Sequence, residues 1–317
     1  MKLCIQTGGI IEAFGFEKGL EAIKNAGFDS IDWGFGHALN QSNFYHDTYR
    51  GSCIFEKGLD EVVACYEERI SLIRKYGLEI YQAHAPTPSY IHSKPEVLDY
   101  NIEIYKRMVE FMDYLGCENL VIHGVNFLPF QNREMTPEMH EKLNFKLYES
   151  LIPALVKCKN PVKVCLENIF NYYFRNEEKD FGFEEGVCCE PHNTARWIDT
   201  LNAKAGKKVF AFCFDTGHAN LVGYKQSDII SVLGDRISCL HVHDNDGRED
   251  FHLSPFTGTV DWVDFCDALK SISYNGAISF ETFAQIGRAN ALGTDMCSVW
   301  LETLCKMGKL FDKKITE

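Results

Sequence analysis

Carboxylate and imidazole side chains stand directly after short apolar runs at several places in the chain. Glu167 ends the run VCLE, Asp215 ends FAFCFD and Glu281 ends ISFE. Histidines end or follow other such runs: His84, His123, His218, His241 and His243. Carboxylates together with imidazoles suit Zn, Mn, Fe or Co, and an excess of carboxylates also suits Mn or Mg. These residue types point to a divalent-metal site if the apolar runs are strands that end on one side of the fold.

Each of these residues also has an ordinary structural explanation. A single histidine after a strand is more often a hydrogen-bonded turn residue than a ligand, and Asp215 in DTGHA could cap the helix that follows. The repetition of the pattern favours a metal site over these structural explanations, because five consecutive expected strands, the fourth to the eighth, end in a histidine or a carboxylate. Unpaired carboxylates that are buried together are costly, and a cation is the simplest partner for them.

The segments that must position these residues alternate between short apolar runs and longer amphipathic stretches. Strands are expected at residues 3–7, 30–33, 79–84, 120–123, 162–167, 209–215, 237–243 and 277–281. Helices are expected at residues 16–26, 59–76, 95–115, 137–157, 193–202, 226–233, 261–271 and 289–307. Eight alternating units in 317 residues predict an α/β fold, a (β/α)8 TIM barrel that forms a single domain over residues 1–317. The first strand is followed by TGGIIEAFGF, which lacks the GxGxxG spacing of dinucleotide-binding folds.

The expected connections differ in length on the two sides of the barrel. Gly27, Gly77 and Gly116 stand just past helix ends with a strand close behind, as in short turns with a left-handed glycine. The connections after the strands are longer, above all residues 40–56 and 168–191. Barrel enzymes carry their active sites on such loops, at the carboxyl ends of the strands.

Composition excludes several classes of partner. The net charge of −13 and the lack of a dense Lys/Arg cluster argue against nucleic acids and anionic membranes. The start MKLCIQTGG lacks a signal-peptide layout and no apolar run could span a bilayer, so a cytoplasmic protein is expected. The 13 cysteines are odd in number and scattered, which is typical of reduced thiols, and the adjacent pair Cys188–Cys189 has no second pair at zinc-site spacing.

Several motifs, taken in their order along the chain, resemble a known superfamily. They are QAHAP (82–86), VIHG (121–124), LEN (166–168), FDTGHA (214–219), HVHDNDG (241–247), DFHLSPFTGTVDW (250–262) and SFET (279–282). Together they resemble the xylose-isomerase-like TIM barrels, which include sugar isomerases, sugar epimerases and the endonuclease IV type of abasic-site endonuclease. The resemblance covers nearly the whole expected barrel.

This resemblance implies a set of site residues. The shared metal ligands of the superfamily would be Glu167, Asp215, His243 and Glu281, with His241 one layer deeper as a supporting or core residue. Endonuclease IV-like members bind two further metals, and residues at the corresponding positions are present here: His84, His123, His218, Asp250 and His252. The turn after His252 reads SPFTG where a PGxG pattern is common in the superfamily.

The function expected from this resemblance is isomerisation or epimerisation of a sugar, sugar phosphate or polyol. A divalent ion (Mn, Mg, Zn or Co) would stabilise an enediolate while Glu167 and Glu281 remove and return the proton from opposite sides. His84, His218 and Arg248 could contact substrate oxygens. Asp32, Trp33 and the aromatic residues of the loop after Glu167 could line the pocket or simply pack.

Other functions stay open from the sequence. The alternatives are an endonuclease IV-like multi-zinc phosphodiesterase and a metal-dependent lyase such as a keto-inositol dehydratase. A non-enzymatic binding role is less favoured, because many titratable groups converge on one expected pocket. A homo-oligomer is expected by analogy with the superfamily.

Overall fold

The structure is a computed structural model that describes residues 1–39, 44, 48–126, 135–174 and 181–317. The chain divides into two compact units, each assembled from separate segments. Unit 1 comprises Met1–Trp33, Glu67–Gln82 and Cys213–Glu317, and unit 2 comprises Gly34–Tyr66 and Ala83–Phe212. All four boundaries cut through elements: β2 (Ser30–Gly34), α4 (Leu59–Lys75), β3 (Glu79–His84) and β8 (Phe210–Asp215). That the whole chain is one domain stays a prediction.

Eight strands belong to one sheet, in the order β10-β1-β2-β3-β4-β5-β8-β9. The other strands of this sheet are β1 (Leu3–Gln6), β2 (Ser30–Gly34), β4 (Asn119–Val121), β5 (Lys163–Glu167), β9 (Ile237–His241) and β10 (Ile278–Phe280). The strands are parallel, and β1 pairs with both β2 and β10, so the first strand meets the last. The expected (β/α)8 fold class is therefore confirmed.

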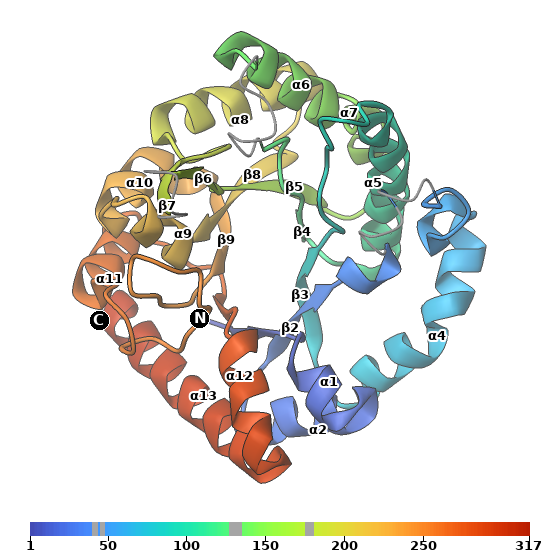
Figure 1. Ribbon diagram of the computed structural model, residues 1–317. Helices are drawn as coiled ribbons and strands as arrows, with labels where there is room; N and C mark the ends of the chain where they lie inside the picture. Colours follow the sequence, from blue (N-terminus) through green and yellow to red (C-terminus); the bar gives the residue numbers. More distant parts are fainter. Residues whose placement is uncertain (40–43, 45–47, 127–134, 175–180) are drawn as a thin grey trace. The chain divides into compact units, whose positions relative to one another are not determined.

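Unit 1 holds β1, β9, β10 and most of β2. The register sets Gln6 beside Asp32, and beyond β9 the residue Val242 forms a parallel bridge with Phe280. Its helices are α1 (Ile10–Phe14), α2 (Phe16–Ala26), α9 (Thr216–Leu221), α10 (Gln226–Leu233), η3 (Gly234–Arg236), α11 (Trp262–Ser271), α12 (Phe283–Ala289), η4 (Asn290–Leu292) and α13 (Thr294–Thr316). The long helix α13 packs against both α2 and α11 (Figure 1).

Unit 2 contains β4 and β5, which pair in parallel, and a separate antiparallel hairpin. The hairpin consists of β6 (Phe170–Phe174) and β7 (Phe181–Glu185). The helices here are η1 (Gly36–Ala38), η2 (Ile54–Glu56), α5 (Glu96–Leu115), α6 (Pro137–Glu149), α7 (Ile152–Leu155) and α8 (Pro191–Ala205). In α5 the apolar side chains recur at helical spacing and are buried, which fixes the helix face that packs inward.

Some expected elements differ from those in the structure. The expected helix 137–157 is divided between α6 and α7, because Pro153 lies in the first turn of α7 and cannot continue a helix from the preceding turn. The expected helix 289–307 is interrupted at Gly293, whose φ of 92° is not helical. Residues 170–185, expected to be part of a long loop, include the hairpin β6–β7. The strand expected at 237–243 ends at His241.

The cysteine and membrane expectations can be compared with the described residues. All 13 cysteines belong to the described part of the chain and carry thiols rather than disulfides. Cys188 and Cys189 are both buried, and burial raises the pKa of the Cys188 thiol well above its usual value. Among the described residues, no helix is both long enough and apolar enough to cross a bilayer.

Candidate metal centre

Two of the expected ligands, Asp215 and Glu281, converge with His241 within unit 1. Asp215 ends β8, His241 ends β9 and Glu281 follows β10. The His241 Nδ1 lies 3.4 Å from Glu281 Oε2 and 3.9 Å from Asp215 Oδ2. Two ligand atoms bound to one tetrahedral ion at about 2.0–2.1 Å lie roughly 3.3 Å apart, so this spacing fits a metal ion. All three side chains are buried, and two carboxylates in one buried place are stable only with a cation or protons.

The placement of the two histidines of HVH differs from the expectation. His241, expected to lie deeper as a supporting residue, is the histidine that is grouped with Asp215 and Glu281. His243, expected as the ligand in this set, lies beyond the end of β9, with its Nε2 3.0 Å from Asp215 Oδ2. The expected strand was two residues too long, which moved the predicted ligand past the strand end.

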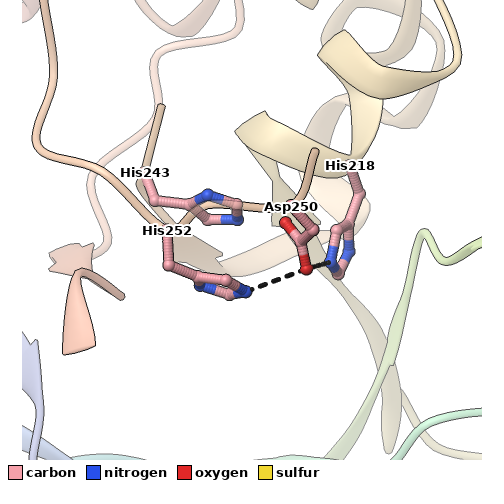
Figure 2. Close-up of side chains that lie close together, drawn as sticks. All are labelled: His218, His243, Asp250 and His252. Carbon is pink, nitrogen blue, oxygen red and sulfur yellow. Dashed lines mark hydrogen bonds and ion pairs between the residues drawn. The ribbon is translucent and has the colours of Figure 1, made fainter. Parts of the chain in front are cut away.

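His243 belongs to a second group, with His218, Asp250 and His252 (Figure 2). Asp250 Oδ2 lies 3.0 Å from His252 Nε2 and 3.7 Å from His218 Nε2. The rings of His243 and His252 stack, with centroids 4.0 Å apart and planes 14° from parallel. The Nδ1 atom of His243 is buried and has no hydrogen-bond partner among the described residues. One carboxylate and three imidazoles at this spacing form a set that a transition metal could fit.

Electrostatics in this second group already favour positive charge. Burial raises the pKa of Asp250, but hydrogen bonds with His218 and His252 outweigh it and hold this pKa well below its usual range. Burial lowers the pKa of His252, whereas its hydrogen bond to Asp250 and the neighbouring carboxylates raise this pKa to about 9. A proton on His252 thus offsets part of the negative charge of the neighbouring carboxylates, and a divalent ion would offset more of it.

A close approach of backbone and ring positions His243. A Cβ atom on Gly217 would lie 2.0 Å from the His243 Cε1 and 2.5 Å from its Nδ1, so only glycine fits beside the imidazole. Gly217 lies in α9, whose first turn is capped by Asp215: the Asp215 Oδ1 accepts from the His218 backbone N–H at 2.6 Å. Asp215 is therefore both a helix cap and a member of the candidate centre, and the two explanations of DTGHA are compatible.

Asp244 holds the loop that carries Asp250 and His252. Its side chain is fully buried and accepts four hydrogen bonds, from the backbone N–H groups of residues 245, 258 and 260 and from the indole of Trp262. Its backbone also pairs with Leu253 in both directions. The sequence motif HVHDNDG drew attention to the histidines, but the anchoring role of Asp244 emerges only from the structure.

Unit 2 contains a third group of expected ligands, in which His84 ends β3, His123 follows β4 and Glu167 ends β5. The His123 Nε2 lies 2.9 Å from the His84 Nε2 and 2.9 Å from the Glu167 Oε2. The His84 Nδ1 lies 2.9 Å from the backbone oxygen of Ala85. If it donates there, the neutral His84 has its Nε2 lone pair directed at the other two side chains. Two imidazoles and a carboxylate at this spacing also fit a metal ion.

The remaining expected residues have less direct connections to these groups. Arg248 is exposed, in a turn where its backbone N–H donates to Asp246 Oδ1 at 2.9 Å. Trp33 is core, 2% exposed, and Phe170 packs edge-on against Tyr172 within the hairpin. Asp32 is the exception: it is fully buried, and its Oδ2 lies 3.2 Å from the Nε2 of His241.

The chain is similar in sequence to several known proteins. The chain is 24% identical to a probable endonuclease 4 of Staphylococcus carnosus, over 66% of each chain. It is 22% identical to the inosose dehydratase of Geobacillus kaustophilus, over 66% of this chain and 69% of the relative.

Solved structures share the fold at lower identity. The D-psicose 3-epimerase of Clostridium cellulolyticum H10, solved with D-tagatose, has a TM-score of 0.66 and 14% identity, covering 98% of this chain and 99% of the other. The IolI protein with a zinc atom has a TM-score of 0.65 and 16% identity, covering 99% and 98%. The model of the xylose isomerase-like TIM barrel family matches residues 20–301. The chain therefore belongs to the xylose isomerase-like TIM barrel family.

Proposed function

We propose that the protein is a divalent-metal-dependent isomerase or epimerase of a sugar, sugar phosphate or polyol. The observation that carries this proposal is the buried convergence of Asp215, His241 and Glu281, whose ligand atoms have the spacing of a metal site. Sugar epimerases among the proteins of the same fold support the choice of substrate class. Mn, Mg, Zn and Co all suit this donor set.

The proposed ligands are Asp215, His241 and Glu281, and a ligand role for Glu167 stays a prediction from the sequence. When bound, a divalent ion would polarise a substrate carbonyl and a neighbouring hydroxyl and so acidify the carbon between them. Glu281 is 7% exposed, and its Oε1 accepts a long hydrogen bond of 3.5 Å from the Gln6 amide nitrogen. We assign to Glu281 the removal of that proton, and a role for Glu167 in its return stays a prediction from the sequence. Return from the opposite face inverts the carbon.

A second candidate function rests on the two further groups. His218, Asp250 and His252, with His84 and His123, would allow three metals in all, as a phosphodiesterase of the endonuclease 4 type would need. The net charge of −13 opposes DNA as the substrate, because binding to a phosphate backbone requires a basic face. A lyase such as a keto-inositol dehydratase would need the same proton abstraction, and inosose dehydratase is among the relatives. Cytoplasmic location, self-association and the absence of nucleic-acid binding stay predictions.

The test begins with metal identity and stoichiometry, measured by plasma mass spectrometry on protein never exposed to chelator. The same sample is then incubated with ketohexoses and keto-inositols in deuterated water, and exchange at the carbon beside the carbonyl is followed by NMR. About one metal per chain with exchange into a ketose and recovery of its epimer supports the proposal. Two or three zinc ions per chain with cleavage of abasic DNA would replace it with the phosphodiesterase, and loss of water from a keto-inositol would replace it with the lyase.

A further inference from the structure

A fully buried carboxylate, that of Asp32, contacts one of the proposed metal ligands. Asp32 lies in β2 with 0% exposure, and its Oδ2 is 3.2 Å from the Nε2 of His241, which is also 0% exposed. A carboxylate buried in a protein core loses its hydration, which destabilises the fold unless a partner compensates for that loss. His241 is that partner, and it is the same histidine that faces Asp215 and Glu281 through its other nitrogen.

The two ring nitrogens of His241 therefore have different neighbours. Nε2 faces Asp32, an acceptor, so the proton of the neutral ring belongs on Nε2. This leaves the lone pair on Nδ1, which points to Glu281 Oε2 at 3.4 Å. A metal ion needs that lone pair. Asp32 thus selects the tautomer of His241 that can bind a metal, and its charge makes Nδ1 a stronger donor.

Gln82 fixes the position of Asp32. Its amide nitrogen donates to Asp32 Oδ2 at 3.0 Å and to the Leu240 backbone oxygen at 3.3 Å. The same carboxylate oxygen therefore accepts from both Gln82 and His241. The other oxygen, Asp32 Oδ1, is buried and has no hydrogen-bond partner among the described residues. A carboxylate that served only the stability of the fold would be poorly placed here, because half of its hydrogen-bonding capacity is unused.

We propose that Asp32 is a positioning residue for the metal centre, acting through the tautomer and basicity of His241. This inference rests on the metal site of the proposed function but does not depend on which reaction that site performs. The structural alternative is that Asp32 and His241 form a buried pair that only stabilises the core. The two differ in what Asp32→Asn changes, because removal of a buried charge can leave the apo fold as stable as before or more stable.

The test compares metal affinity with fold stability in matched variants. Wild-type, Asp32→Asn and Cys4→Ala proteins are stripped of metal, and zinc and cobalt affinities are measured by competition with a chromophoric chelator. Cys4 is a suitable control because it is fully buried and close to both Asp32 and His241, while its own side-chain hydrogen bonds are with Ser30 and Ser279. Thermal unfolding of the apo proteins and the visible absorption spectrum of the cobalt forms are recorded in parallel.

We expect Asp32→Asn to weaken metal binding about 10- to 100-fold and to shift the cobalt spectrum, with the apo unfolding temperature unchanged or raised. Cys4→Ala should lower the unfolding temperature while its cobalt spectrum stays that of the wild type. If Asp32→Asn does not fold, Gln82→Met, which leaves the charge but removes the orienting amide, should weaken binding severalfold.

Three outcomes would overturn the proposal. The first is a metal affinity within twofold of wild type in Asp32→Asn, or in Gln82→Met if only that variant folds. The second is a loss of metal affinity in Cys4→Ala as large as that in the test variant. The third is a wild-type protein that binds no divalent ion. The last outcome would remove the proposed function too. In contrast, wild-type protein that binds metal but turns over no sugar would refute the proposed function alone, since the effect of Asp32 on affinity could still be measured.

Discussion

Replacing Gly217 with alanine should destabilise the protein although alanine is the better helix former. The added Cβ would lie 2.0 Å from the His243 Cε1, which is far inside van der Waals contact, and both residues are fully buried or nearly so. Overpacking of this kind costs about 1–3 kcal/mol, and displacement of His243 from Asp215 Oδ2, 3.0 Å from its Nε2, adds about 1–2 kcal/mol. The free energy of unfolding should therefore fall by roughly 2–5 kcal/mol.

The assay is thermal unfolding of apo protein, followed by circular dichroism. For a chain of 317 residues, with an unfolding entropy of about 2.1 cal/mol/K per residue, this loss lowers the Tm by roughly 3–7 °C. Gly287→Ala is the matched control, because Gly287 also lies in a helix but a Cβ there meets nothing within 4 Å. That variant should be stabilised by up to about 1 kcal/mol. Equal stability of Gly217→Ala and wild type would refute the close approach on which the placement of His243 depends.

Three other predictions concern the reaction, the metal and the pH dependence of stability. Glu281→Gln should reduce turnover of a ketose substrate by at least about 100-fold with the circular dichroism spectrum unchanged, because a base and a ligand are lost at nearly constant side-chain volume. The exposed Glu302→Gln is its control. Near-native turnover of Glu281→Gln would exclude a catalytic role for Glu281. Removing the metal with chelator should lower the Tm, since an ion present at about 100 times its Kd stabilises the folded protein by about 2.7 kcal/mol. In Glu281→Gln the chelator should lower the Tm by less. An equal decrease in both proteins would mean that the ion binds away from Glu281. Burial lowers the pKa of His140, whose Nε2 lies 2.7 Å from the Val125 backbone oxygen, so the unfolded chain binds a proton at this residue more readily than the folded one, and stability should fall as the pH drops below the ordinary pKa of 6.5. Urea unfolding at pH 8 and pH 5 should show a larger loss of stability for wild type than for His140→Gln. Identical losses in the two proteins would contradict this role of His140.

The sequence was sufficient for the fold class because the signal is repeated eight times. Apolar runs such as FAFCFD and amphipathic segments such as 226–233 each carry enough periodicity to be recognised, and the structure has α10 at those residues. Glycines past helix ends were equally informative: Gly27 and Gly116 have left-handed backbone, with φ of 101° and 72°. The hairpin β6–β7 was missed, because aromatic and charged residues within one loop resemble neither a buried strand nor a helix.

The candidate site was less accessible from sequence than the fold. Residue types at strand ends predicted which histidines and carboxylates gather, and the structure brings them together in three groups. We expected His243 rather than His241 as the ligand; both residues point to the same face of the strand, and the choice between them depends on where β9 ends. Strand ends depend on pairing partners far along the chain, here Val242 with Phe280, and on the turn that brings Leu253 back to Asp244.

The four hydrogen bonds that converge on Asp244 have a consequence for how this protein could diversify. They join the two ends of the loop 245–261, and we expect Asp250 and His252 to keep their positions when residues at its exposed tip are substituted. The tip, with Asp246, Arg248 and Glu249, is held by local hydrogen bonds from the backbone N–H groups of Arg248 and Glu249 to Asp246. Insertions or substitutions there would alter what approaches the centre without disturbing its ligands. If the proposed function holds, substitutions at this tip would change substrate preference while the group of His218, Asp250 and His252 keeps its arrangement.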